Sequence, residues 1–328
     1  MSASRSLIVG SLAMGWTWEG KAGPYLMWGR WRDNTMNLEK RIQVARGEQP
    51  ADLVIKGAKL VNVFSGEIYP NDIAIEEDRI VGLGPYEGRA IFDATGLYAA
   101  PGFIDAHIHL ESSCLMVPEF ARAAVPLGTT TVITDPHEIA NVMGLAGISY
   151  MLDSSQNLPL NIFYMLPSCV PATEMETSGA RLDAKDLVPL LEDQRVLGLA
   201  EMMNYPGVLA RNPGVLAKLS LAQNRMIDGH APGLSGRNLS AYIATGIRSD
   251  HECTLLEEAM EKLRLGMHVL IREGSVAKNL KALLPAVTSA NSHRFGFVSD
   301  DRYPTDLLEE GHLNGLLRKA VALGLPPV

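Results

Sequence analysis

The sequence predicts an α/β fold, a (β/α)8 barrel of the TIM type with a small β domain in front of it. The main observation is that apolar runs of strand length alternate with runs of helix length through residues 99–328. Eight units of even length are what such a barrel requires, whereas an open doubly wound sheet rarely continues so far. The dinucleotide fingerprint GxGxxG does not follow the first predicted strand, which also disfavours the open sheet.

Two segments precede the barrel. Residues 1–35, which are rich in Trp and Gly and show no hydrophobic period, are predicted to be a disordered tail. Residues 36–98 are predicted to form part of the small β domain, because strand-like runs between residues 51 and 84 alternate with turn signals. Those turn signals are Ser65-Gly66 and Pro70-Asn71-Asp72.

The barrel region divides into predicted strands and helices in strict alternation. The strands are expected at residues 101–110, 129–135, 160–168, 196–204, 225–230, 247–252, 267–275 and 294–301. The helices are expected at residues 120–128, 144–156, 184–193, 214–224, 239–246, 255–266, 280–288 and 307–324.

Composition narrows the class of protein. The formal net charge of −8 argues against a nucleic-acid binder, which needs a basic face. No uninterrupted apolar run is long enough to span a bilayer. The odd number of cysteines, Cys114, Cys169 and Cys253, and the absence of a CxxC motif fit a reducing compartment. We therefore expect a cytoplasmic protein without a nucleic-acid or membrane partner.

The apolar run that begins the barrel ends in two histidines, His107 and His109. Side chains at positions i and i+2 of a strand point the same way, so both imidazoles are expected to face the barrel axis. Active sites of such barrels lie at the carboxyl ends of the strands. Two converging imidazoles there can hold a metal ion, although an isolated pair is more often simply buried and hydrogen-bonded.

Other predicted strands end in the same residue types. These are Asp135, His137 and Glu138 after the second strand, Glu201 in the fourth, His230 and His251 at the fifth and sixth, and Asp300 and Asp301 at the eighth. Alone, each of Glu201, His230 and His251 suggests a surface or capping residue, but their joint positions favour a metal site. Asp135 and Glu138 remain divided between substrate binding and helix capping, because Asp135 before Pro136 is a good N-cap and N1 pair.

Six strings carry a resemblance to a known family. They are HIHLESS from residue 107, TDPHEIANV from 134, GLAEMMNYPGV from 198, DGHAPGL from 228, SDHE from 249 and SDDR from 299. Together they resemble the amidohydrolase superfamily, and DPHEIANV and HAPGL in particular are similar to adenine deaminases of the bacterial type. The resemblance covers residues 51–328. It implies a metal-dependent, distorted TIM barrel beside a small β-sandwich.

The resemblance also implies a binuclear metal site. Its ligands would be His107, His109, Glu201, His230, His251 and Asp300. Relatives such as hydantoinases carry a carbamylated lysine where this chain has Glu201, and a glutamate can bridge two cations directly. Imidazoles and carboxylates without a thiolate suit manganese, iron or zinc, and the resemblance favours manganese or iron. Asp300 rather than Asp301 is taken as the family's aspartate because it comes first.

The implied reaction is the hydrolysis of adenine to hypoxanthine and ammonia, a step of purine salvage. Two cations would lower the pKa of a bridging water, and the hydroxide would attack C6 of the ring. Asp300 would take the proton and deliver it to the leaving amine, with Glu138 as the second catalytic candidate. Asp135, His137 and Glu111 are expected to contact the substrate. A homo-oligomer is expected.

Three alternatives remain open. Another amidohydrolase, acting on a cyclic amide or an N-acetyl substrate, would have the same ligands. A non-catalytic scaffold would be expected to have lost several of them. Finally, the family's sandwich takes strands from both ends of the chain, and this sequence stops soon after the last predicted helix. The C-terminal sandwich strands and a further domain are therefore expected to be missing, which would leave an inactive fragment.

Overall fold

The computed structural model describes residues 6–8, 34–173 and 175–327. The chain divides into two compact units, and the boundary between them in the sequence lies between Gly102 and Phe103. The predicted boundary after residue 98 thus falls inside β6 (Tyr98–Ala100), near the end of the first unit. Most of the predicted disordered tail, residues 1–35, lies outside the described residues.

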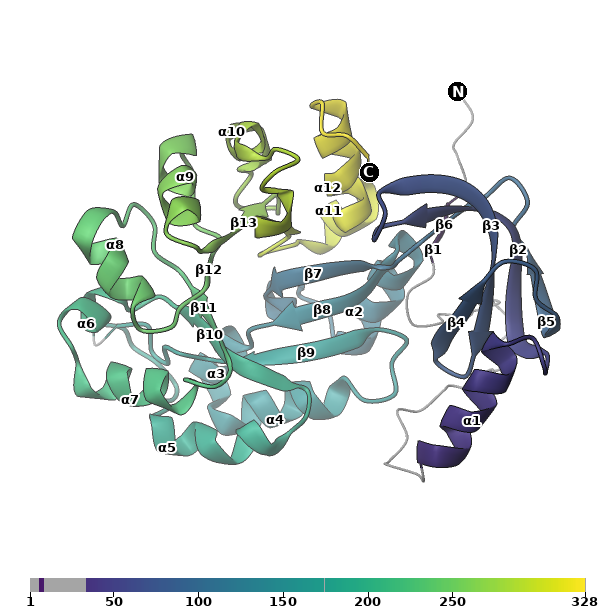
Figure 1. Cartoon of the computed structure of the whole chain (residues 1–328). Helices are drawn as coiled ribbons and strands as arrows, with labels where there is room; N and C mark the ends of the chain where they lie inside the picture. The colour runs from purple at the N-terminus through teal and green to yellow at the C-terminus, as the bar shows by residue number, and fades with distance from the viewer. Residues whose placement is uncertain (1–5, 9–33, 174, 328) are drawn as a thin grey trace. The chain divides into compact units, whose positions relative to one another are not determined.

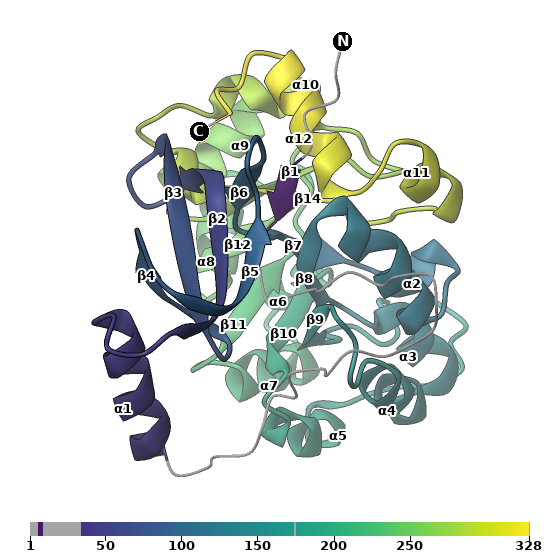
Figure 2. The same ribbon diagram turned by 90° about the vertical axis from the view of Figure 1, so that its right-hand side faces the viewer.

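The first unit is built on one six-stranded sheet. Its elements are β1 (Ser6–Ile8), α1 (Asn34–Ala45), β2 (Ala51–Asn62), β3 (Glu67–Glu76), β4 (Arg79–Leu83), β5 (Gly88–Asp93) and β6. The strand order is β1-β6-β2-β3-β4, and β5 also pairs with β2. Helix α1, which the sequence patterns did not predict, lies beside β3 and β4 (Figure 2). β1 and the start of α1 fall within the segment predicted as a tail.

One of the two predicted turns in this unit is wrong. Ser65-Gly66 does lie in the turn between β2 and β3, but Pro70-Asn71-Asp72 lies inside β3. The reason is a register shift in β2, where Gly57 has a φ of +72°. The Gly57 N–H donates to Oδ1 of Asp72 at 2.8 Å. The turn-forming residues therefore face a bulge in the neighbouring strand rather than forming a turn.

The second unit contains parallel strands in two sheets. The strands are β7 (Phe103–Ile108), β8 (Thr129–Thr134), β9 (Asn161–Leu166), β10 (Val196–Met202), β11 (Met226–Gly229), β12 (Ser249–Asp250), β13 (His268–Arg272) and β14 (Phe295–Val298). Strands β7 to β11 form one sheet in sequence order, and β12 to β14 form the other. Every predicted strand of this region is present, although β12 is short.

Helices lie around the outside of the curled strands (Figure 1). They are α2 (Val117–Ala124), α3 (His137–Met143), α4 (Leu145–Ser154), α5 (Ala184–Leu187), α6 (Tyr205–Leu209), α7 (Pro213–Leu221), α8 (Gly236–Ile243), α9 (Leu256–Arg264), α10 (Leu280–Leu283), α11 (Pro304–Glu309) and α12 (Leu313–Ala322). Short 3-10 turns occupy Leu110–Ser113, Val125–Leu127, Val188–Glu192, Leu284–Ala286 and Ser292–Arg294. Within the described ranges, none of these helices has the length and apolar character needed to cross a bilayer.

Backbone hydrogen bonds link the two parallel sheets at both edges. On one side, the N–H of Arg248 donates to the carbonyl of Ile227 at 3.1 Å. On the other, the N–H of Asp300 donates to the carbonyl of His107 at 3.0 Å, and the N–H of His109 donates to the carbonyl of Asp300 at 3.0 Å. The eight strands thus follow one curled arrangement, and the ends of β7 and β14 lie against each other.

Candidate active site

The six predicted ligands come together at the carboxyl ends of the parallel strands. His107 lies in β7 and Glu201 in β10, whereas the others directly follow a strand or lie within two residues of its end. Five of them are buried, with exposures between 1% for His251 and 7% for Asp300, and His230 is partly buried. Sequence-distant segments therefore meet in one polar, largely solvent-excluded cluster.

Glu201 lies at the centre of this cluster. Its Oε1 is 3.2 Å from Nε2 of His109, and its Oε2 is 2.6 Å from Nδ1 of His230 and 3.1 Å from Nε2 of His251. Burial alone would raise the pKa of this carboxyl, but the hydrogen bonds with His109, His230 and His251 outweigh it and hold the pKa of Glu201 well below its usual range. The carboxylate of Glu201 is thus ionised, with Oε1 beside His109 and Oε2 beside His230 and His251.

Asp300 lies beside His107 and His109, the two histidines at the end of β7. Its Oδ1 lies 3.3 Å from Nε2 of His107 and 3.3 Å from Nε2 of His109. Its backbone has a φ of +58°, in the left-handed region that residues other than glycine seldom adopt. The two backbone hydrogen bonds with β7 hold this conformation, as is common for strained residues at functional sites. These contacts involve Asp300 and not its neighbour Asp301.

The donor atoms fit metal binding. Atoms of His107, His109 and Asp300 lie within 4.8 Å of one another, as do those of His107, Glu201 and His251. Nδ1 of His109 lies 3.0 Å from the carbonyl oxygen of Asp135, which can only accept a hydrogen bond. Nδ1 must therefore carry a proton, which leaves Nε2, the nitrogen that faces the carboxylates, as the atom that could bind a metal ion.

Asp135 and His137 lie beside the same cluster. Nδ1 of His137 is 2.9 Å from Oδ2 of Asp135 and 3.4 Å from Oε1 of Glu201. Burial would lower the pKa of His137, but the charge of Asp135 outweighs it and raises the pKa to about 9. Asp135 does not cap α3, because residue Pro136 takes the N-cap position and no side chain caps the helix. The capping interpretation of Asp135 is therefore wrong.

Glu138 and Glu111 are placed differently. Glu138 lies in the first turn of α3, and burial is the main reason why its pKa is raised. Oε1 of Glu111 accepts the N–H of Ile139 at 3.3 Å, and burial raises the pKa of Glu111 to about 7. Glu111 also lines a surface pocket of about 290 Å³ between α2 and α4. Its bond to α3 tethers the turn after β7 to that helix.

Two charged residues beside the ligands were not predicted from the sequence. Nη1 of Arg272, at the end of β13, donates to Oδ2 of Asp300 at 3.0 Å. Glu252, which follows His251, accepts from Nη2 of Arg272 at 3.0 Å. Both residues lie at carboxyl ends of strands, so the rule that located the ligands would also have located them.

A buried lysine supports the β11 and β12 side of the cluster. Nζ of Lys262 donates to Oδ2 of Asp250 at 2.9 Å, to Oε1 of Glu258 at 2.8 Å and to the carbonyl of Ala231 at 2.7 Å. Oδ1 of Asp250 accepts the N–H of Ala231 at 2.8 Å. Asp250 precedes His251 and Ala231 follows His230, so this network fixes the backbone beside both histidines.

A second buried network supports the β7 and β14 side. Oδ2 of Asp105 accepts the hydroxyl of Ser299 at 2.6 Å and lies 3.1 Å from Nε2 of His312. Nδ1 of His312 lies 2.7 Å from the hydroxyl oxygen of Thr129. Ser299 directly precedes Asp300. His312, which was not predicted as a ligand, bonds to Thr129 of β8 and lies beside Asp105 of β7.

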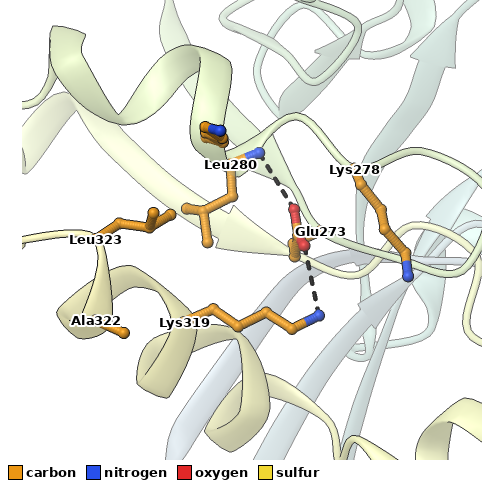
Figure 3. A pocket seen from close by; sticks show the side chains of 7 residues that line it. Glu273, Lys278, Leu280, Lys319, Ala322 and Leu323 are labelled. Carbon is orange, nitrogen blue, oxygen red and sulfur yellow. Dashed lines mark hydrogen bonds and ion pairs between the residues drawn. The ribbon is translucent and has the colours of Figure 1, made fainter.

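A separate pocket of about 350 Å³ lies between α10 and α12 (Figure 3). None of the six predicted ligands lines it. Its walls include Glu273, which accepts the N–H of Leu280 at 3.2 Å and lies 3.5 Å from Nζ of Lys319. Glu273 is already paired with Leu280 and Lys319, so this pocket does not offer a second cluster of metal-ligand side chains.

Comparisons with known proteins show the family of the chain. The sequence model of the Amidohydrolase family matches residues 98–325. The chain is 52% identical over 289 residues to an adenine deaminase of Desulfatibacillum aliphaticivorans, covering 88% of the chain and 51% of that protein. It is 53% identical over 293 residues to adenine deaminase 2 of Carboxydothermus hydrogenoformans, covering 89% of the chain and 51% of that protein. The chain thus spans about half the length of these curated relatives.

Solved structures with low sequence identity share the fold. A triazine hydrolase variant is 14% identical, with a TM-score of 0.58 over 81% of this chain and 75% of that one. Ochratoxinase from A. niger is 15% identical, with a TM-score of 0.53 over 85% of this chain and 82% of that one. At these identities the likeness concerns the arrangement of the strands and helices.

The lysine network yields a stability prediction. Lys262→Met is expected to lower the free energy of unfolding by about 3–5 kcal/mol, because Asp250 and Glu258 would lose the buried cation between them. Urea unfolding followed by circular dichroism measures this change. Lys185→Met, at an exposed lysine, should stay within about 0.5 kcal/mol of the original chain. A loss below about 1 kcal/mol for Lys262→Met would show that the ammonium is dispensable.

Proposed function

The chain belongs to the amidohydrolase family, and from this premise we propose that it carries the active site of a metal-dependent adenine deaminase. The convergence of six imidazole and carboxylate ligands, with Glu201 at the centre, is the observation that carries the proposal. The names of the relatives at about half sequence identity support adenine as the substrate. They do not favour the alternative of a cyclic amide or N-acetyl substrate.

The ligand set is proposed to hold two divalent ions. His107, His109 and Asp300 would hold one, His230 and His251 would hold the other, and Glu201, which lies beside histidines of both groups, would serve both. Manganese or iron is favoured over zinc by the resemblance, since the donor types suit all three. When bound, such ions supply Lewis acidity that lowers the pKa of a water molecule toward about 7.

Side chains of this chain would then move the protons. Oδ1 of Asp300, which faces His107 and His109, would accept the proton of the attacking water. The same carboxyl then donates it to the departing amino group, so adenine and water yield hypoxanthine and ammonia. Glu138, with its raised pKa, is the second candidate for this transfer. Asp135, His137 and Glu111 are proposed to orient the purine.

We also propose a closed barrel, a partial β-sandwich and a cytoplasmic location for this chain. The hydrogen bonds at both sheet edges support a closed (β/α)8 barrel, and the sheet of the first unit supports part of a β-sandwich. The three free cysteines are compatible with a cytoplasmic location. A place in purine salvage is proposed from the reaction alone. A homo-oligomer remains a prediction.

Metal content is the first test. The purified protein, supplied with manganese, should contain about two equivalents of metal per chain by elemental analysis, because the six ligands are enough to hold two ions that share Glu201. Glu201→Gln should bind less metal than the original chain, because the neutral amide is a weaker ligand. A content of one equivalent or none in the original chain would contradict the binuclear proposal.

The substrate test compares the free base with its nucleoside. Adenine should release ammonia and form hypoxanthine, whereas adenosine should remain unchanged, because the strings DPHEIANV and HAPGL resemble those of adenine deaminases, the name that the relatives carry. Ammonia release and chromatography of the purine measure both. Equal turnover of adenosine, or hydrolysis of dihydroorotate in place of adenine, would refute this choice of substrate.

Asp300 is predicted to act on the proton more than on the metal. Asp300→Asn should keep most of the bound metal, since five other ligands remain, yet lose at least about 10²-fold in turnover of adenine. Asp301→Asn is the matched control and should be much milder, since Asp301 is not the aspartate beside the histidines. An inactive Asp301→Asn beside an active Asp300→Asn would reverse the assignment. Loss of metal from Asp300→Asn would make its role structural and leave Glu138 as the proton carrier.

A further inference from the structure

The side chain of Arg272 lies between two carboxylates of the site. Its Nη1 donates to Oδ2 of Asp300 at 3.0 Å, and its Nη2 donates to Oε2 of Glu252 at 3.0 Å. Nη1 also makes a hydrogen bond with Oε1 of Glu252, so the guanidinium binds Glu252 through two parallel bonds. Arg272 is only 8% exposed, and a cation this buried is stable only with such partners.

The two carboxylate oxygens of Asp300 therefore have different neighbours. Oδ1 lies beside the imidazoles of His107 and His109, whereas Oδ2 accepts the hydrogen bond from Arg272. The terminal torsion of an aspartate is broad and roughly twofold, so the torsion itself does not distinguish the two oxygens. The bond from Arg272 removes this equivalence and keeps one chosen oxygen toward the histidines.

Glu252 connects Arg272 to the other half of the site. Its Oε1 lies 3.5 Å from Nδ1 of His230 and 3.5 Å from Nε2 of His251. One guanidinium thus joins the carboxylate beside the β7 histidines to the carboxylate beside the β11 and β12 histidines. A lysine ammonium has the charge but not the planar fork, so it cannot make all of these bonds in the same geometry.

We propose that Arg272 is a positioning residue that fixes the orientation of Asp300 for proton transfer. It acts through Asp300 and makes no contact with the substrate. Without its fork, Asp300 can turn about its terminal torsion, which slows proton transfer but leaves adenine binding unchanged. The proposal rests on the proposed function for the identity of the reaction, whereas the pairing of the two side chains does not depend on it.

The test is a double-mutant cycle in the manganese-loaded protein. Arg272→Lys should lose about 10²-fold in kcat for adenine, with KM changed by less than about 3-fold. On the Asp300→Asn background, the same change should lose less than about 2-fold further, because its effect passes through Asp300. An equal loss on both backgrounds, an effect confined to KM, or an unchanged kcat in the single variant would overturn the proposal.

Two other variants control for folding and for charge. Arg195 also pairs with a carboxylate, Asp193, at 2.8 Å, but none of its partners is a predicted ligand. Arg195→Lys should therefore stay within about 2-fold of the original kcat. Glu252→Gln leaves the bond between Arg272 and Asp300 in place but also changes the charge 3.5 Å from His230 and His251. Its bound manganese is therefore measured first, and at equal metal content it should lose less kcat than Arg272→Lys. A larger loss than that of Arg272→Lys at equal metal content would overturn the proposal.

A measurement without activity separates this proposal from the proposed function. In the metal-free chain, Arg272→Lys and Asp300→Asn should each lower the urea midpoint, and the double variant should lower it by less than the sum. Additive shifts would overturn the pairing even if the chain deaminates adenine. Failure of the original chain to deaminate adenine would contradict the proposed function, and the midpoints would still report on the pairing.

Discussion

The burial of one negative charge is the constraint on which this site depends. The carboxylate of Glu201 is 3% exposed, and a charge so far from water must be balanced by close partners. The partners are four histidines, His109, His137, His230 and His251. They follow β7, β8, β11 and β12, so no local segment of the chain could supply them. The parallel strands on both sides of β10 are therefore what makes the charge tolerable in this position.

The polar neighbours of the ligands keep this arrangement rigid. Asp105 lies two residues before His107 and accepts a hydrogen bond from Ser299, which directly precedes Asp300. Asp250 directly precedes His251 and accepts the N–H of Ala231, which follows His230. In each case a ligand on one strand is fixed relative to a ligand on another by a bond between their neighbours. Stability and function are thus coupled within one or two residues of the site.

The sequence was informative wherever the signal is local. Alternating strand and helix patterns located the strands, and the residues that end them include all six predicted ligands. The patterns failed where pairing across the sheet decides, as at Pro70, which lies inside β3 opposite a bulge of β2. Arg272 and Glu252 were missed because single charged residues near strand ends are usually solvated. Only the fold shows that these two bind each other and Asp300.

The backbone of Asp300 has a consequence for the freedom of this position to change. Its φ of +58° belongs to a region that costs most residues roughly 1–2 kcal/mol and that glycine, asparagine and aspartate tolerate best. Among these three, aspartate alone carries an acid. Glutamate would preserve the charge, but it would have to adopt the unfavourable main-chain conformation. Its side chain is also longer by one methylene, so its carboxylate would lie in a different place. The conformation of the main chain thus narrows the amino acids available to natural variation here as strongly as the chemistry does.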